Sequence, residues 1–290
     1  TADVKVLSTD ALRGMTSTQI AAFTTTQVKA LTAGQVSSLD SSDLNALTTD
    51  QFAVFSSAQA AALTSAQVDT MTTDDLVSLG AANIRQFSAA SIGVLDSAQF
   101  NALTTDQFAI LTSTQVAAIT SAQTATMATD DLQAISSANI RVLTTDALAG
   151  MGTAQIGAFT TTQVKQLTAA QIASLDSSDL NAFTSDQFGA FTSAQVAALT
   201  SAQVDTMTTE DLVALGSVNV KMLSTAAIGL LDSAQFNALT SDQFSMLTSA
   251  QAAAITSAQT ATMTTDDLRA LSTADVKVLS TDALRGMTST

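Results

Sequence analysis

Apolar and polar residues follow an eight-residue period along the whole chain. In the octad Thr192–Leu199, Thr stands at position 1, Gln at position 4, Val at position 5 and Leu at position 8. Position 8 is Leu, Met, Phe or Ile from Leu7 to Met287, and position 5 is apolar with few exceptions. No insertion breaks this register, and such self-similarity is typical of a repeat array.

This period excludes one continuous helix and favours many short ones. Eight residues of helix advance about 800°, so an apolar stripe would rotate by about 80° with each octad and cover every face. A strand requires alternating apolar and polar residues, which the spacing of positions 5 and 8 does not provide. The pattern therefore predicts an all-α solenoid of short helices, one per octad, with a corner after each position 8.

The polar positions predict where each helix begins. Thr or Ser at position 1 with Gln at position 4 has the spacing of a capping box, in which each side chain pairs with a backbone N–H of the first turn. All Lys and Arg residues stand at position 6, late in the octad, whereas nearly all acidic residues stand at positions 1, 3 and 4. This distribution suits the helix dipole. A helix this short is unstable alone, so positions 5 and 8 must be buried against neighbouring helices.

Longer repeats lie above the octad. Residues 1–18 reappear unchanged as residues 273–290, and partial matches recur at half that shift, 136 residues. We therefore expect a single continuous array over residues 1–290, with macro-repeats at 1–136 and 137–272 and the start of a third at 273–290. Internal blocks of seven and ten octads correspond to whole turns if one superhelical turn takes about 3.4 octads. Neither end of the array is more polar than its middle, which predicts either continuation in a longer chain or end-to-end association.

Composition narrows the possible functions. The chain has 290 residues, 46% hydrophobic and 12% charged, with a net charge of −15. Such acidity argues against nucleic-acid binding, and no apolar run has the length of a membrane span. Cys and His are absent, so the chain offers no disulfide, no metal-binding thiol and no usual base for a Ser or Thr nucleophile. We expect no enzyme activity and no cofactor. The Met residues at position 8 are expected to fill the core.

Four acidic pairs are the only candidate ligand sites, and each precedes a Leu: Asp74 and Asp75, Asp130 and Asp131, Glu210 and Asp211, and Asp266 and Asp267. Paired carboxylates can bind Ca²⁺ weakly. However, the sequence lacks the Gly turn and the alternating ligands of a calcium loop. The favoured interpretation places these carboxylates in the first turn of a helix, with no metal site. Likewise, the Thr and Ser rows are expected to serve as helix caps.

The run Leu63-Thr64-Ser65-Ala66-Gln67-Val68 resembles tracts in very long bacterial surface or secreted proteins labelled as adhesins. The resemblance implies an extracellular structural protein: a filament, a surface-layer or sheath component, or an adhesin stalk. Its expected partners are further copies of itself, end to end or side by side, with no nucleic acid and no membrane insertion. The alternative is a repetitive surface that binds glycan, ice or divalent cations.

Overall fold

A computed structural model describes residues 2–287 and contains 36 short helices and no strand within them. The chain divides into two compact units, Thr1–Met151 and Gly152–Thr290, and each is described by itself.

The helices of the first unit are α1 (Ala2–Lys5), α2 (Thr9–Arg13), α3 (Ser17–Ala21), α4 (Thr25–Ala30), α5 (Ala33–Ser38), α6 (Ser41–Leu44), α7 (Thr49–Phe52), α8 (Ser57–Ala61), α9 (Ser65–Asp69), α10 (Thr73–Ser78), α11 (Ala81–Ile84), α12 (Ala89–Gly93), α13 (Ser97–Ala102), α14 (Thr105–Ala109), α15 (Ser113–Val116), α16 (Ser121–Thr124), α17 (Thr129–Ala134), α18 (Ser137–Ile140) and α19 (Thr145–Ala149).

The helices of the second unit are α20 (Thr153–Ala158), α21 (Thr161–Val164), α22 (Ala169–Ser174), α23 (Ser177–Leu180), α24 (Ser185–Gly189), α25 (Ser193–Ala198), α26 (Ser201–Asp205), α27 (Thr209–Ala214), α28 (Ser217–Val220), α29 (Thr225–Leu230), α30 (Ser233–Ala238), α31 (Ser241–Ser245), α32 (Ser249–Ala253), α33 (Ser257–Thr260), α34 (Thr265–Ala270), α35 (Thr273–Val278) and α36 (Thr281–Gly286).

Each octad forms one helix of four to six residues, as the sequence predicts. Before α25, the Thr192 hydroxyl accepts the backbone N–H of Gln195 at 3.4 Å, and the Gln195 side chain accepts the N–H of Thr192 at 2.7 Å. These two bonds are the predicted capping box. At the other end Leu199 leaves the helical region, with φ −60° and ψ 128°, and turns the chain into the next octad.

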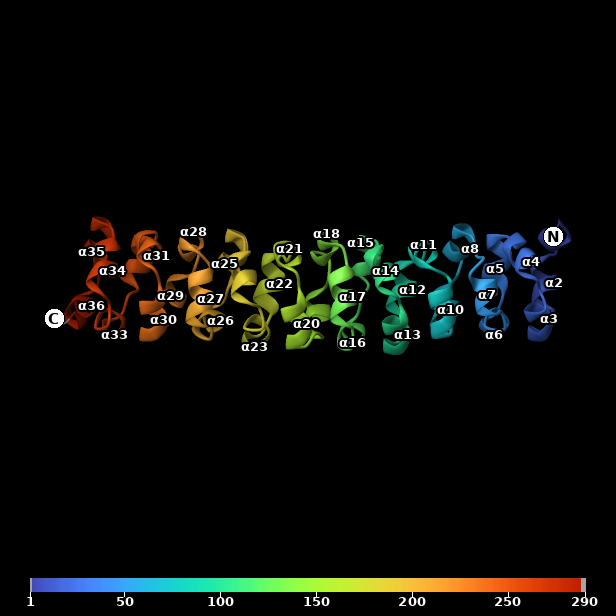
Figure 1. The fold of residues 1–290 in the computed structure, drawn as a ribbon, viewed down its shortest axis with the longest axis horizontal. Coiled ribbons are helices and arrows are strands. Elements are labelled where there is room, and N and C mark those ends of the chain that lie inside the picture. The colour runs from blue at the N-terminus through green and yellow to red at the C-terminus, as the bar shows by residue number, and fades with distance from the viewer. Residues whose placement is uncertain (1, 288–290) are drawn as a thin grey trace. The chain divides into compact units, whose positions relative to one another are not determined.

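Helices three octads apart pack on each other within each unit. In the first unit α2 packs on α5 and α14 on α17, and in the second unit α22 packs on α25 and α33 on α36. Figure 1 shows this order as successive layers of short helices, in which segments of similar colour lie side by side within each unit. The fold is therefore all-helical and solenoid-like, in agreement with the fold class predicted from the octad.

Positions 5 and 8 form the core that the short helices share. Val36 and Phe108 at position 5 are completely buried, and Leu39 at position 8 is nearly so. Phe100 and Phe108 meet edge to face with their ring centroids 5.0 Å apart, and the equivalent rings of Phe236 and Phe244 are 5.1 Å apart. Burying such side chains is the main source of stability for helices too short to be stable alone.

The methionines at position 8 divide into two groups. The buried ones are Met71, Met127, Met151 and Met207, as expected of core residues. Met15, Met263 and Met287 are only half-buried. Within residues 2–287, every helix is too short or too polar to cross a membrane.

Two corners use a left-handed glycine in place of a side-chain cap. Gly80 and Gly216 have φ values of 73° and 80°, a region that favours glycine. Before Gly80, Leu79 remains helical, with φ −57° and ψ −27°, and the N–H of Gly80 donates to the carbonyl of Val77 at 3.1 Å. The left-handed glycine then reverses the chain, as it commonly does at the end of a helix.

Candidate functional site

In each unit, buried polar side chains lie between successive turns of the solenoid. Most of them are glutamines at position 4 of the octad. Gln115 is 1% exposed. Its Oε1 accepts the N–H of Thr112 at 2.9 Å within its own helix cap. Its Nε2 donates to the carbonyls of Ile84 at 2.8 Å and Phe87 at 3.0 Å, four octads earlier. One amide thus caps its own helix and holds the end of a helix in the preceding turn.

The same arrangement recurs through both units, and we call these residues the inter-turn glutamines. They donate to backbone carbonyls 28 to 31 residues earlier; in the first unit they are Gln35, Gln51, Gln59, Gln67, Gln99, Gln107, Gln115 and Gln123. In the second unit they are Gln187, Gln195, Gln203, Gln235, Gln243, Gln251 and Gln259.

Sequence reasoning assigned these glutamines a capping role and missed their second one. A signal for it was present in the sequence. A capping box accepts Glu as readily as Gln, yet position 4 never holds Glu. A carboxylate could accept the N–H of position 1 but could not donate to the carbonyls of the preceding turn. The presence of Gln at most position-4 sites, with Glu at none, therefore indicates that the NH₂ group is needed there.

Where position 4 is Asn or Asp, the joint between turns is made differently. The Asn83 side chain donates to the carbonyl of Phe55 at 2.9 Å. It thus makes one bond to the preceding turn, where an inter-turn glutamine such as Gln115 makes two. Asp211 accepts hydroxyl protons from Thr208 at 2.6 Å and from Ser185 of the adjacent turn at 2.8 Å. The donor now comes from position 2 of an octad three earlier, so the direction of the bond is reversed.

A third kind of joint replaces the glutamine with alanine. Ala147 stands at position 4, and its carbonyl accepts the hydroxyl of Thr124 at 2.7 Å. In the second unit Ala283 and Thr260 form the same bond at 2.6 Å. This bond explains why Thr occupies the otherwise apolar position 5 at these two places. The turns approach so closely there that a Cβ on Gly150 would lie 2.4 Å from the carbonyl oxygen of Ser121.

The four acidic pairs occupy the first turns of α10, α17, α27 and α34. In each pair the position-3 carboxylate is exposed and the position-4 carboxylate is buried; the exposed members are Asp74, Asp130, Glu210 and Asp266, and the buried members are Asp75, Asp131, Asp211 and Asp267. The two members of a pair therefore lie in different environments. No group of three or more acidic side chains converges on a common point among the residues that the structure describes.

Burial changes the proton affinity of some of these carboxyls. Desolvation raises the pKa of Asp75, and the neighbouring Asp74 charge adds to this effect, while hydrogen bonds from Thr72 oppose it. Desolvation likewise raises the pKa of Asp131 against an opposing bond from the Thr105 hydroxyl. The pKa of the exposed Glu210 is lowered, chiefly by a hydrogen bond from its own backbone N–H.

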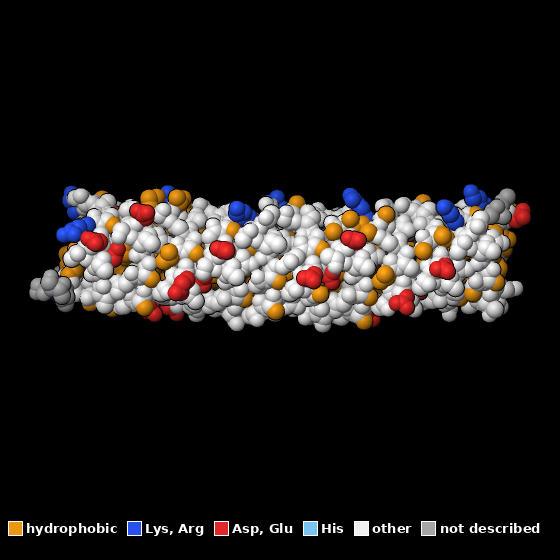
Figure 2. Space-filling model, viewed as in Figure 1, with side chains coloured by type: hydrophobic (Ala, Val, Ile, Leu, Met, Phe, Trp, Pro, Cys, Tyr) orange, Lys and Arg blue, Asp and Glu red, His pale blue; other side chains and the backbone are white. Residues whose placement is uncertain are grey.

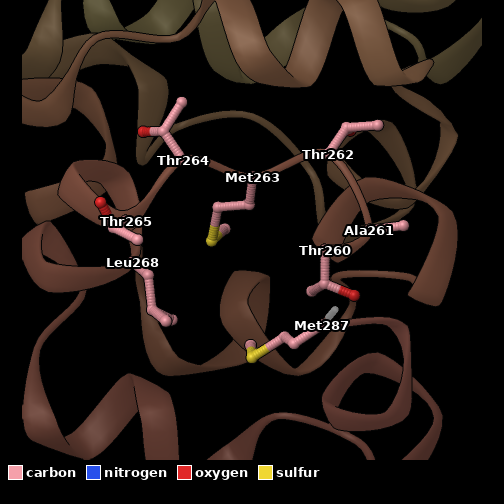
Figure 3. Close-up of a pocket in the computed structure, with 8 residues that line it drawn as sticks. All are labelled: Thr260, Ala261, Thr262, Met263, Thr264, Thr265, Leu268 and Met287. Carbon is pink, nitrogen blue, oxygen red and sulfur yellow. The ribbon is translucent and has the colours of Figure 1, made fainter. Parts of the chain in front are cut away.

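A hollow of about 350 Å³ lies beside α33, α34 and α36 of the second unit. Figure 3 shows the sulfur ends of Met263 and Met287 pointing into it, opposite Leu268, with Thr side chains around the rim. Its lining carries no charged side chain. The hollow therefore offers apolar contact but no carboxylate or amine to act as acid or base.

Comparison with known proteins identifies the repeat. The sequence model named ALTTAQ repeat matches residues 1–33, 36–73, 68–105, 124–161, 172–209, 212–249 and 261–290, which together make up most of the chain. A search of curated proteins found no match. The matched segments include capped helices and inter-turn glutamines described above, such as Gln59 and Gln195. The chain belongs to the ALTTAQ repeat family.

Proposed function

We propose that the chain is a structural shaft: a segment of an extracellular filament, a surface-layer or sheath component, or the stalk of an adhesin. The observation that carries this proposal is the use of the inter-turn glutamines. In both units the buried polar side chains hold one turn to the next, as Gln115 and Gln195 do. Such a repeat can be extended without limit because each turn needs only its neighbours.

We further propose that one superhelical turn takes about 3.4 octads. Most side-chain hydrogen bonds between turns support this value, because they join residues 25 to 31 positions apart, between three and four octads; the bonds of Thr124 and Thr260 span 23 residues. Duplications of seven or ten octads would then add nearly whole turns. The stacking would be preserved at each duplication.

A catalytic role is not part of this proposal. The chain has no His or Cys, and its Ser and Thr hydroxyls at position 1 are engaged in capping. The alternative role of binding divalent cations draws no support from the acidic pairs, since Asp74 is exposed while Asp75 is buried. We expect millimolar Ca²⁺ to leave the melting temperature unchanged; a rise would show that the native state binds it.

The shaft proposal is tested by the length of arrays of different size. Chains with one, two and four macro-repeats would be compared by small-angle X-ray scattering. Packed helix layers are about 8–10 Å apart, so five turns predict an added length of about 40–50 Å for each macro-repeat. Length that grows in proportion to repeat number would support the shaft. A maximum dimension that grows as that of a globule or a random coil would overturn it.

A further inference from the structure

Most of the exposed acidic residues at position 3 form a row along each unit, here called the acidic row; Asp10, Asp146 and Asp282 stand at position 3 outside it. Its members are Asp50, Asp74, Asp106 and Asp130 in the first unit, and Asp186, Glu210, Asp242 and Asp266 in the second. Their helices are stacked in order. In the first unit α7 packs on α10 and α14 on α17, and Gln107 of α14 donates to the carbonyl of Leu76 of α10 at 3.0 Å. The acidic row thus places one carboxylate on each successive turn.

Six of the ten Lys and Arg residues form a second row, here called the basic row, with one charge on every second turn. Its members are Lys29, Arg85 and Arg141 in the first unit, and Lys165, Lys221 and Lys277 in the second, each 56 residues from the next within its unit. The stacking between them is again continuous. Gln59 of α8 donates to the carbonyls of Val28 and Leu31 on either side of Lys29, and α8 packs on α11, which precedes Arg85.

The two rows lie apart on the surface of each unit. Figure 2 shows Lys and Arg side chains along one edge of the visible face, and Asp and Glu side chains across that face. Among residues 2–287, the ion pairs are Arg269 with Asp266 at 3.1 Å and Arg285 with Asp282 at 3.6 Å. The six charges of the basic row therefore have no ion-pair partner within the part of the chain that the structure describes.

We propose that the basic row of one copy docks side by side against the acidic row of a second copy. The rows match in period, because acidic residues two turns apart, such as Asp74 and Asp130, are separated by the same 56 residues as Arg85 and Arg141. A match in period lets every basic residue meet a carboxylate at once, so weak surface pairs act together. This inference rests on the shaft proposal and identifies a second copy of the chain as the partner of the shaft.

The contact is heterologous, since a different surface of each copy takes part. Every copy that has docked through its basic row still presents its acidic row to another. Side-by-side growth into a bundle or a layer follows from this geometry. Each chain has a net charge of −15, so such an assembly carries an excess of acidic groups. The repulsion between these groups limits the growth of the assembly at low ionic strength.

Charge-reversal variants of the purified chain test the docking, with sedimentation equilibrium as the measurement. We expect the chain to self-associate at about 0.15 M salt and to dissociate at about 1 M, where screening is strong. The double variant Arg85→Glu/Arg141→Glu should lower the association constant at least about tenfold, and so should Asp74→Arg/Asp130→Arg. An equimolar mixture of the two variants should associate more strongly than either alone.

The matched control is Asp10→Arg/Asp146→Arg, which makes the same change in net charge as Asp74→Arg/Asp130→Arg at exposed position-3 carboxylates outside the acidic row. It should leave association nearly unchanged. Circular dichroism confirms that each variant remains folded. A wild-type chain that stays monomeric at millimolar concentration would overturn the docking, as would a control that weakens association as much as the row variants. Neither result would affect the length measurement that tests the shaft.

Discussion

At the scale of single residues, the protein relies on one property of the amide group, which accepts and donates at once. The Gln195 Oε1 accepts a proton within its own helix cap, while its Nε2 donates to Val164 at 2.7 Å and Leu167 at 2.8 Å. The Val164 carbonyl also accepts the N–H of Leu167 at 3.1 Å, and the Gln195 amide adds a bond to the Leu167 carbonyl at the helix end. Leaving such a carbonyl buried without a partner costs about 1–3 kcal/mol. Ionised Glu and Asp cannot make both kinds of bond, because they have no proton to donate.

Asp75 occupies a glutamine position without the means to donate, and its raised pKa predicts a pH dependence. The folded state binds its proton more tightly than the unfolded state, so Asp75 destabilises the fold above its folded pKa. Stability is regained as the pH falls through that raised pKa toward the ordinary value of 3.8.

We predict that Asp75→Asn raises the free energy of unfolding at pH 7 by about 0.5–1.5 kcal/mol. The new amide can donate to the carbonyl of Leu47, as Asn83 does to Phe55. Urea unfolding at pH 7 and pH 3 measures the effect, which should shrink at the lower pH. The exposed Asp106→Asn variant is the control for net charge. An equal gain from Asp106→Asn would refute the explanation.

At the scale of the helices, the backbone conformation of the corner between two octads sets the position of the next helix. Most corners use an extended residue at position 8 followed by a Thr, Ser or Asp cap, as at Leu199 and Thr200. The corner at Gly80 uses a left-handed backbone and has no side-chain cap. Both solutions start the next helix at position 2, so the octad register is retained.

Two glycine substitutions separate the effect of the corner from that of the helix. Gly80→Ala should cost roughly 1–2 kcal/mol, because a side chain in the left-handed region is strained. Gly34→Ala should stabilise by up to about 1 kcal/mol, since Gly34 lies inside α5 and a Cβ there meets no atom within 4 Å. Thermal unfolding of both variants provides the comparison. If Gly80→Ala proved neutral, the proposed role of the left-handed corner would be wrong.

Much of this local structure could be predicted from the sequence, and the connections between turns could not. The Thr-to-Gln spacing predicts the capping box at Thr192, and the apolar period predicts that Val36 and Leu39 are buried. The partner of the Gln115 amide lies 28 residues away in Phe87, a distance that no local pattern encodes. The sequence predicts that the acidic pairs lie in the first helical turn. It does not predict which member of each pair is buried, because that depends on the position of the neighbouring turn.

At the scale of the whole molecule, stability should be a sum of local contributions. Helices pack chiefly on those three octads away, and arrays of this kind behave as chains of nearest neighbours. Many of the same residues recur 136 positions apart, so equivalent sites in the two units have similar surroundings. The rings of Phe100 and Phe108 and those of Phe236 and Phe244 meet in almost the same geometry.

We therefore predict that Phe108→Ala and Phe244→Ala each cost about 3–5 kcal/mol, because each leaves a cavity in a fully buried site. The two values should agree within about 0.5 kcal/mol. Hydrogen exchange should accelerate most in the turns next to the substitution. Uniform acceleration over both units would contradict the nearest-neighbour description.

The most direct test of the central claim, that the glutamine NH₂ groups hold the turns together, compares two Gln→Glu variants by urea unfolding at pH 7. Gln115→Glu keeps the cap but loses the bonds to Ile84 and Phe87, and should cost about 2–4 kcal/mol. Gln19→Glu, at an exposed glutamine that caps Thr16, should change stability by less than about 0.5 kcal/mol. Equal effects of the two substitutions would contradict the claim, because the cap alone would then account for the choice of Gln.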